Sequence, residues 1–313
     1  MLHVVHHVDY MAPPPTRGTF KFDKYQLVMV ALRDSGYPIT EHAPDPMPRE
    51  WLEAVHDPAY VAEVFAARVP PDKERRIGFS VTPRIRDRVR HTNGGTWLAA
   101  RLALEHGYAA NSAAGSHHAL HDTGAGYCVF NDLAVTANRL IAQGEARRIL
   151  IVDCDVHQGD GTASLTAGRE DIFTLSLHAE KNFPVRKARS NLDIGLPDGL
   201  DDDGYMDALE RHLPPVFDTF APDLVLYQAG VDPHGDDRLG RLNLTDKGLE
   251  RRDRFVVAQS RERGLPIASA LGGGYGDQHA VAARHARSMI AMARTNAEIG
   301  SCAAQSKRVM GGL

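Results

Sequence analysis

The chain has 313 residues, of which 43% are hydrophobic, and it carries a formal net charge of −4 at pH 7. That hydrophobic fraction is enough for the core of one large α/β domain covering residues 1–313. The slightly acidic balance argues against nucleic acid or an anionic membrane surface, so we expect a peptide, protein or small-molecule partner.

Strand-like and helix-like patterns alternate, which predicts an α/β fold with a mainly parallel sheet between layers of helices. In chain order, the expected strands cover residues 2–5, 39–42, 148–153, 172–177, 223–227 and 266–271. Helices are expected over 25–32, over 95–106 until Gly107, and from the N-cap candidates Asn131 and Asp132 to residue 142. The expected strands run into polar or glycine-rich residues at their carboxyl ends, where open α/β sheets bind ligands.

Three further segments have weaker patterns. Charged residues crowd 73–90, which we interpret as a solvated loop or rim. The prolines at 13–15 predict a short loop, and the tail after residue 297 shows no convincing periodicity, so we expect it to pack loosely.

The cysteines and apolar runs are typical of a cytoplasmic protein. Cys128, Cys154 and Cys302 form no CxxC pair, which argues against a disulfide framework or a structural zinc knuckle and favours a reducing compartment. The segment MLHVVHHVDY lacks the features of a signal peptide. No run approaches the roughly 18 apolar residues of a membrane span, so we expect no membrane insertion. No pattern indicates an oligomeric state.

A candidate metal site follows the clearest buried strand. Side chains alternate along a strand, so Asp153, Asp155 and His157 point to one side. Burying them there is costly unless a metal or hydrogen bonds compensate. Catalytic zinc takes three protein ligands and keeps one open position, and Asp232, after another strand, fits as a further ligand. The alternative is that these carboxylates are helix caps or salt-bridge partners.

A histidine pair lies in a loop rich in glycine and alanine. His117 and His118 are adjacent, and carboxylates are available at Asp153 and Asp160. A carboxylate that accepts a proton from one ring nitrogen fixes the tautomer that the other nitrogen presents. Such a histidine could deprotonate a water beside a metal, although most of the 16 histidines are expected to be structural or exposed.

A glycine run and a tyrosine end the last expected strand. Glycines at 272–274 allow the backbone to approach a ligand closely, and Tyr275 could donate its hydroxyl to a developing oxyanion. The alternative is a tight turn between strand and helix.

These motifs resemble the histone deacetylase superfamily, in the order in which that family carries them. The resemblance extends from His6-His7 to about Ala293, and the segments 92–96 and 235–240 look closest to class IV-like bacterial members. The motifs are His117-His118, Gly126-Tyr127-Cys128, Asp153-x-Asp155-x-His157-x-Gly159-Asp160, Asp232 and Gly272-Gly273-Gly274-Tyr275.

The resemblance implies an arginase/deacetylase-type fold of three layers, α/β/α, with about eight strands in the central sheet. It implies that an acylated lysine or similar amine is hydrolysed to a carboxylate and a free amine. The implied zinc ligands are Asp155, His157 and Asp232. A potassium ion is implied beside the zinc, bound through Asp153, Asp155, His157, Ser176 and Leu177.

The resemblance also implies roles for the remaining residues. His118 would be the general base and later the acid, oriented by Asp160, and His117 paired with Asp153 would be its electrostatic partner. Tyr275 would polarise the acyl carbonyl. The residues implied to bind the substrate are Gly126, Tyr127, Phe183, Gly273 and Gly274, with the two aromatic side chains as walls of an apolar tube.

The chain departs from the usual family pattern at several positions. Tyr127 stands where many relatives have Phe, and Gln158 replaces the second His of the common His-His-Gly-Asp form, as it does in class IV members. Some relatives carry a basic residue in the channel that releases acetate. Lys21 and Lys24 lie in the corresponding region.

Alternative functions remain open at this point. An acetylpolyamine amidohydrolase and a dimanganese, arginase-like ureohydrolase share the implied fold, and a non-catalytic binding module is the third alternative. The amine could belong to a protein or to a small molecule. Class IV relatives favour fatty-acyl groups, and the small residues between 111 and 126 could leave room for a long chain, or could merely allow a tight loop.

Overall fold

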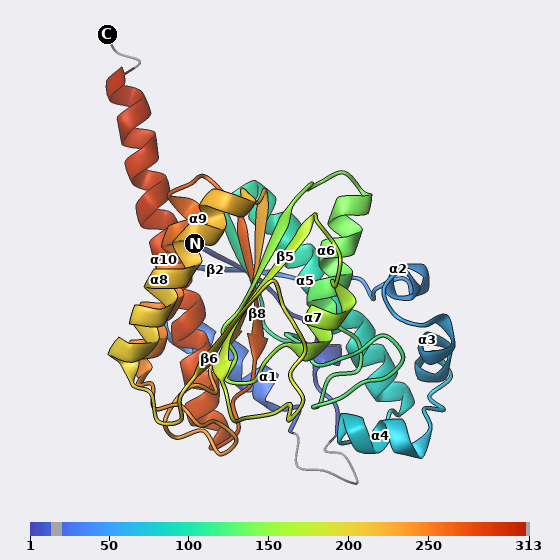
Figure 1. Ribbon diagram of the computed structural model, residues 1–313. Coiled ribbons are helices and arrows are strands. Elements are labelled where there is room, and N and C mark those ends of the chain that lie inside the picture. Colours follow the sequence, from blue (N-terminus) through green and yellow to red (C-terminus); the bar gives the residue numbers. More distant parts are fainter. Residues whose placement is uncertain (14–20, 311–313) are drawn as a thin grey trace.

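The computed structural model describes residues 1–13 and 21–310, and the side chains up to residue 302 (Figure 1). The predicted loop at 13–15 therefore lies mostly outside the described residues. Eight strands form one sheet in the order β2-β1-β3-β8-β7-β4-β5-β6, and all neighbouring strands are parallel. The strands are β1 (Leu2–Val5), β2 (Ile39–His42), β3 (Tyr108–Asn111), β4 (Ile149–Asp153), β5 (Ile172–Ala179), β6 (Leu192–Leu196), β7 (Leu224–Gly230) and β8 (Ile267–Gly272). The expected fold class is confirmed.

Helices cover both faces of the sheet. On one face, α1 (Lys24–Asp34), α8 (Asp202–Phe220), α9 (Asp246–Arg261) and α10 (Gln278–Met310) pack around the largest apolar cluster. On the other face, α5 (Pro83–His106) and α6 (Asp132–Ala142) enclose a second cluster. Smaller helices complete the fold: α2 (Arg49–Glu53), α3 (Pro58–Phe65), α4 (Pro71–Ile77) and α7 (Asp160–Leu165).

One expectation from the sequence is wrong. The charged segment 73–90 is helical, because it forms most of α4 and the first turns of α5. Pro83 occupies the first turn of α5, where a missing N–H costs nothing, and the buried Ile85 and Val89 attach this turn to the core. The tail after residue 297 is helical, because α10 continues to Met310, and the end of this helix projects from the body of the fold (Figure 1), so the expectation of loose packing stays a prediction. No helix of the described residues is both long enough and apolar enough to cross a membrane.

The sheet brings the predicted site residues together. In a parallel sheet all strands end at the same edge, and the loops that follow them meet there. The metal candidates follow β4 and β7, and the glycine run with Tyr275 follows β8. The histidine pair follows β3, and Phe183 lies in the connection from β5 to β6. The site is therefore built from five strand ends.

Candidate active site

Three ligand-type side chains converge at the carboxyl ends of β4 and β7. Asp155, His157 and Asp232 are buried, and one ligand atom from each lies within 4.8 Å of the other two. The Nδ1 of His157 is 2.9 Å from Oδ1 of Asp155 and 3.3 Å from Oδ2 of Asp232. Two carboxylate oxygens and one imidazole nitrogen are the donor set of a catalytic zinc site.

The chemistry of this group fits a divalent cation. Oδ1 of Asp232 accepts the N–H of Val156, but its buried Oδ2 accepts no hydrogen bond from the described residues. Burial raises the pKa of Asp232, as does the nearby charge of Asp155, to about 7. Burial opposes the charge of His157, but the close carboxylates of Asp155 and Asp232 outweigh it and raise its pKa to about 10. A bound metal supplies the positive charge that these carboxylates otherwise obtain from a proton.

Two buried residues that the sequence analysis did not single out form hydrogen bonds to the candidate metal ligands or to the main chain beside them. The amide of Gln228, fully buried in β7, donates to Oδ2 of Asp155 over 2.9 Å. Arg252 is also fully buried and donates to the carbonyls of Cys154 and Gly230, over 3.1 and 2.7 Å. One guanidinium thus connects the two strand ends that carry the ligands. Hydrogen bonds of this kind orient metal ligands.

The two histidines have different environments. The Nδ1–H of His118 donates to Asp160 over 2.7 Å, so Nε2 keeps its lone pair. Burial and the neighbouring charge of His117 lower the pKa of His118 to about 4. The Nδ1 of His117 donates to Asp153 over 2.6 Å, and its Nε2 is 3.8 Å from Asp155. Although burial opposes the charge of His117, these carboxylates raise its pKa to about 9.

The loop that carries Tyr275 is held by its main chain. Its N–H donates to Oδ2 of Asp237 over 2.7 Å, and its carbonyl accepts the N–H of Arg238 over 2.8 Å. The Nζ of Lys24 donates to the carbonyl of Gly273 over 2.6 Å. Burial and the nearby charges of Asp155 and Asp232 raise the pKa of Tyr275 well above its usual value, so its hydroxyl remains a donor.

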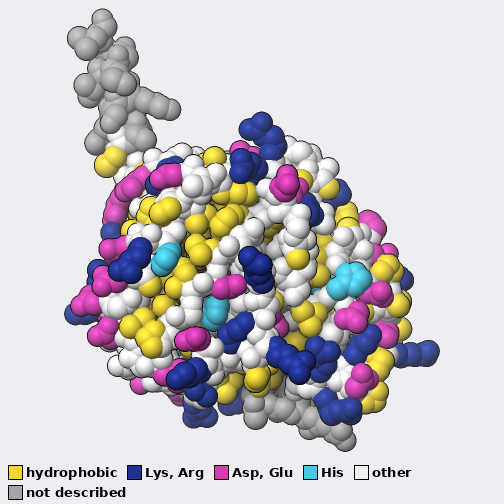
Figure 2. All heavy atoms as spheres, in the orientation of Figure 1, with side chains coloured by type: hydrophobic (Ala, Val, Ile, Leu, Met, Phe, Trp, Pro, Cys, Tyr) yellow, Lys and Arg dark blue, Asp and Glu magenta, His cyan; other side chains and the backbone are white. Residues whose placement is uncertain are grey.

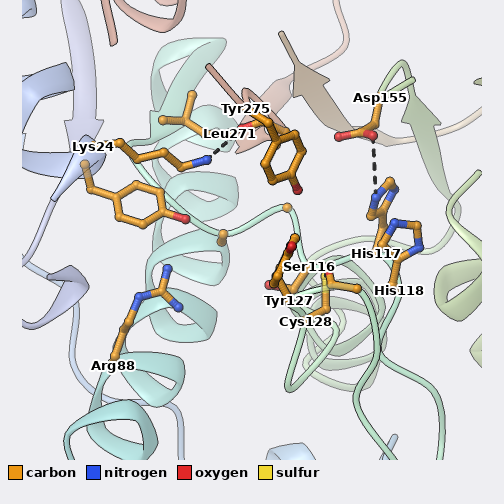
Figure 3. Close-up of a pocket in the computed structure, with 16 residues that line it drawn as sticks. Lys24, Arg88, Ser116, His117, His118, Tyr127, Cys128, Asp155, Leu271 and Tyr275 are labelled. Carbon is orange, nitrogen blue, oxygen red and sulfur yellow. Dashed lines mark hydrogen bonds and ion pairs between the residues drawn. The ribbon is translucent and has the colours of Figure 1, made fainter. Parts of the chain in front are cut away.

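A narrow cavity joins these groups (Figure 3). It has a volume of about 40 Å³ and extends from His118 and Asp155, past Tyr275, to Lys24 and Arg88. Gly126 borders the cavity with a φ of +52°, where a Cβ atom would lie 2.6 Å from the His118 ring and 3.2 Å from the Phe183 ring. The glycine is required for this close approach.

The aromatic residues predicted as walls lie beside the site. The Phe183 ring meets the His118 ring edge to face, with centroids 4.8 Å apart, and the Tyr127 and Tyr275 centroids are 5.8 Å apart. Tyr127 adopts a φ of +68°, which costs energy in a residue other than glycine. Such strain is common at functional sites, and the substrate-binding role of this loop stays a prediction.

Comparison with known proteins identifies the family. Residues 19–292 match the sequence profile of the histone deacetylase domain. The chain belongs to the histone deacetylase family. An uncharacterized protein of Picosynechococcus sp. is 45% identical over 285 residues, which cover 90% of this chain and 95% of that protein.

Two further relatives match over a shorter part of their length. Histone deacetylase 2 of Arabidopsis thaliana is 32% identical over 185 residues, covering 58% of this chain and 48% of the plant protein. A histone deacetylase-like amidohydrolase of Pseudomonas aeruginosa is 30% identical over 175 residues, covering 52% of this chain and 46% of the relative. These alignments span about half of each of these two relatives.

Solved structures share the fold. The acetylpolyamine aminohydrolase from Burkholderia pseudomallei superposes with a TM-score of 0.76 at 21% identity, covering 93% of this chain and 98% of that chain. The HD domain of HDA15 superposes with a TM-score of 0.77 at 20% identity, covering 95% of this chain and 93% of that chain. At this level of identity the likeness establishes a common fold.

The residues expected to bind potassium in this family member lie in adjacent strands. Asp153 at the end of β4 is the register partner of Ser176 in β5, and Leu177 follows in the same buried strand. The Oγ of Ser176 contacts Nδ1 of His178 over 3.0 Å. The arrangement is compatible with the expected ion beside the metal group, and the assignment stays a prediction.

A second group of ligand-type residues lies elsewhere in the described part of the chain. His7, Asp9 and His91 bring one potential ligand atom each within 4.8 Å of one another. The two imidazole rings are stacked at 4.1 Å with only 5° between their planes. Their lone pairs therefore lie in two parallel planes, which does not suit binding of one ion by both rings, and Arg84 pairs with Asp9. We interpret this group as a structural surface cluster.

Proposed function

We propose that this family member is a zinc-dependent amidohydrolase that removes a short acyl group, such as acetyl, from the side chain of a lysine. The observation that carries the proposal is the single cavity that joins a metal ligand, Asp155, to the histidine pair and to Tyr275. A hydrolase of this type needs a metal, a proton acceptor and an oxyanion donor around one reacting carbon atom.

Asp155, His157 and Asp232 would hold the zinc ion. When bound, zinc polarises an acyl carbonyl and lowers the pKa of water. The hydroxyl of Tyr275 donates a hydrogen bond to the carbonyl oxygen of the substrate and holds the negative charge that develops there. The main-chain contacts of the tyrosine to Asp237 and Arg238 fix its position before substrate arrives.

The two histidines have different proposed roles: His118 transfers protons and His117 carries a fixed charge. His118 presents Nε2 because Asp160 accepts the proton on Nδ1. This nitrogen takes a proton from the attacking water and later delivers it to the departing amine. His117 is held between Asp153 and Asp155 and acts as a fixed charge. We also propose that potassium binds through Asp153, Asp155, His157, Ser176 and Leu177.

The size of the cavity favours a short acyl group. The cavity beside the metal group is small, about 40 Å³, compared with about 450 and 410 Å³ for the two other cavities near the site. We therefore propose a short acyl group such as acetyl in preference to the long fatty-acyl chain for which the small residues at 111–126 could leave room. Those glycines permit close backbone approaches, as at Gly126, where a Cβ would meet the ring of His118.

Two rivals are less well supported. A dimanganese ureohydrolase needs a second set of ligands, but Asp153 is engaged by His117, and among the described residues of the site only one group of three ligands is found. A non-catalytic module would not need both the oriented His118 and the clamped Tyr275.

The proposal is tested by turnover of a peptide that carries one acetyl-lysine, with N-acetylputrescine and arginine as comparison substrates. We expect zinc-loaded protein to release acetate from the acetyl-lysine peptide and no urea from arginine. Release of urea would support the ureohydrolase, and absence of any turnover by protein with bound zinc would contradict the proposal.

A further inference from the structure

The mouth of the active site is surrounded by cations. Two larger cavities lie beside residues of the site. The first, of about 450 Å³, shares Lys24, Tyr127 and Tyr275 with the narrow cavity, and the second, of about 410 Å³, is lined by Asp160 and Phe183. Four exposed cations line these cavities, and we call them the rim cations: Lys21 and Arg238 in the first, Arg76 and Arg186 in the second.

The rim cations form no close ion pairs. None of the four has a carboxylate within 4.0 Å among the described residues, although Asp277 is near enough to Arg238 for the two charges to interact. The described carboxylates that line the three cavities are Asp155 and Asp160, which belong to the site itself. Arg and Lys side chains also gather below the centre of the face seen in Figure 2.

The acidic residues near the mouth have other partners. Asp277 accepts the N–H of Ala280 at the start of α10, and this hydrogen bond, with a smaller contribution from the charge of Arg238, lowers the pKa of Asp277. Asp237 accepts three main-chain N–H groups, from Leu239, Gly240 and Tyr275. Asp236 pairs with Arg284 over 2.7 Å. A substrate at the mouth therefore meets positive charge, although the whole chain has a formal net charge of −4.

Apolar side chains of the same rim are exposed between the cations. Phe183 is 41% exposed, Val185 is 96% exposed and Leu239 is 43% exposed. Lys187 fixes the loop of the first two, because its Nζ donates to the carbonyls of Asn182 and Pro184 over 2.5 and 2.7 Å. A surface that alternates cations with apolar side chains suits an extended acidic peptide better than a small polar cation.

We propose that the natural substrate is an acylated lysine flanked by aspartate or glutamate in a protein segment, and this inference rests on the proposed deacylase function. The rim cations lie in cavities beside both aromatic walls, so acidic residues on either side of the acyl-lysine meet positive charge. A polyamine or a lysine-rich tail is repelled by the same groups. The structure thus selects among the substrate classes that the family resemblance leaves open.

The test uses matched acetyl-lysine peptides that differ only in their flanking residues: aspartate, glutamine or lysine on both sides. At low ionic strength we expect kcat/KM to decrease in that order, with at least about a tenfold difference between the aspartate and lysine peptides. The difference should arise mainly in KM and narrow at high salt, because exposed charges are screened. N-acetylputrescine should be hydrolysed no better than the lysine peptide.

Charge-reversal variants locate the effect. The double variant Arg76→Glu/Arg186→Glu and the variant Arg238→Glu should each reduce the preference for the aspartate peptide. Arg147→Glu is the matched control, because this arginine is exposed and lies before β4, at the opposite edge of the sheet. It should leave the ratio between the peptides unchanged.

Binding of fluorescently labelled peptides, measured by anisotropy, distinguishes failure of the proposed deacylase function from failure of the proposed preference for acidic flanking residues. Hydrolysis without a charge preference, or a preference for the lysine peptide, would overturn the inference and leave the deacylase proposal standing. Charge-selective binding that depends on the rim cations, but without hydrolysis, would retain the inference about the mouth and overturn the proposed function. Equal binding of all peptides by wild type and variants would also overturn the inference.

Discussion

Four carboxylates form the floor of the site, whereas four cations surround its mouth. The floor consists of Asp153, Asp155, Asp160 and Asp232, which follow β4 and β7 and are largely buried. The rim cations come from the segment before α1, from α4, from the connection between β5 and β6, and from the loop after β7. The sheet therefore positions the groups that we propose to hold a metal and move protons, whereas loops and the helix α4 supply the positive charge that we propose a substrate meets first. Changes to the floor should affect kcat, and changes to the rim should affect KM.

The largest effect is expected from a change in the floor. His118→Ala removes the proposed general base and should lower kcat by about 10²–10⁴-fold, while the zinc content remains that of the wild type. His121→Ala, at an exposed histidine nearby, is the matched control. If zinc content falls in parallel with kcat in the His118 variant, this histidine is a ligand and the division between base and ligands is wrong.

A slightly smaller effect is expected at the oxyanion donor. Tyr275→Phe should lower kcat by about 10²–10³-fold, because one hydrogen bond to the developing charge is lost. Tyr37→Phe, before β2, should have no effect on turnover. A Tyr275→Phe enzyme with a nearly normal kcat would show that this hydroxyl does not stabilise the transition state.

Asp237 holds the loop of Tyr275 through main-chain hydrogen bonds and lies between the floor and the rim. Asp237→Ala removes three main-chain hydrogen bonds and should lower kcat by between about 10-fold and 100-fold through displacement of Tyr275. Asp237→Asn retains an acceptor oxygen and should recover part of the loss. Asp236→Ala is the control, because that side chain is 75% exposed. If the Asp237→Ala change raised KM and left kcat unchanged, the residue would act in substrate binding at the rim and not through Tyr275.

The smallest effect concerns the rim under changing salt. For an aspartate-flanked peptide, kcat/KM should fall by a few-fold between about 0.05 and 0.5 M salt, while kcat stays constant. The physical reason is that salt screens the attraction between the exposed rim cations and the acidic peptide, which changes substrate binding and leaves the chemical step unchanged. A kcat that falls with salt as strongly as kcat/KM would contradict the separation between the two regions.

Much of the floor could be predicted from the sequence. Asp153, Asp155 and His157 alternate directly after an uninterrupted apolar run, and this pattern was the signal that pointed to the site. The strand itself ends at Asp153, and Asp155 and His157 lie in the bend that follows, so their final geometry depends on tertiary contacts. Gln228 was missed, although a polar residue within the apolar run of β7 is a signal that could have revealed it. Arg252 gave no such signal, because it lies among the charged residues of α9 and its burial depends on tertiary packing.

The rim and several helices could not be predicted in the same way. Lys21, Arg76, Arg186 and Arg238 are distant in sequence, and only the fold places them around one opening. The helix α8 contains two consecutive prolines, Pro214 and Pro215, which a reading by local pattern takes as a helix end. The charged segment 73–90 looked solvated because α4 and α5 bury only a few of its side chains.

The central claim, that the buried acidic floor hydrolyses an amide by means of one zinc ion, is tested most directly by metal titration of activity. Protein stripped with a chelator would be assayed for acetate release from an acetyl-lysine peptide while zinc is added, with bound metal measured in the same samples. We predict no turnover in the stripped protein and full activity at one equivalent of zinc per chain. Activity that survives stripping, or that requires two equivalents of manganese, would contradict the account.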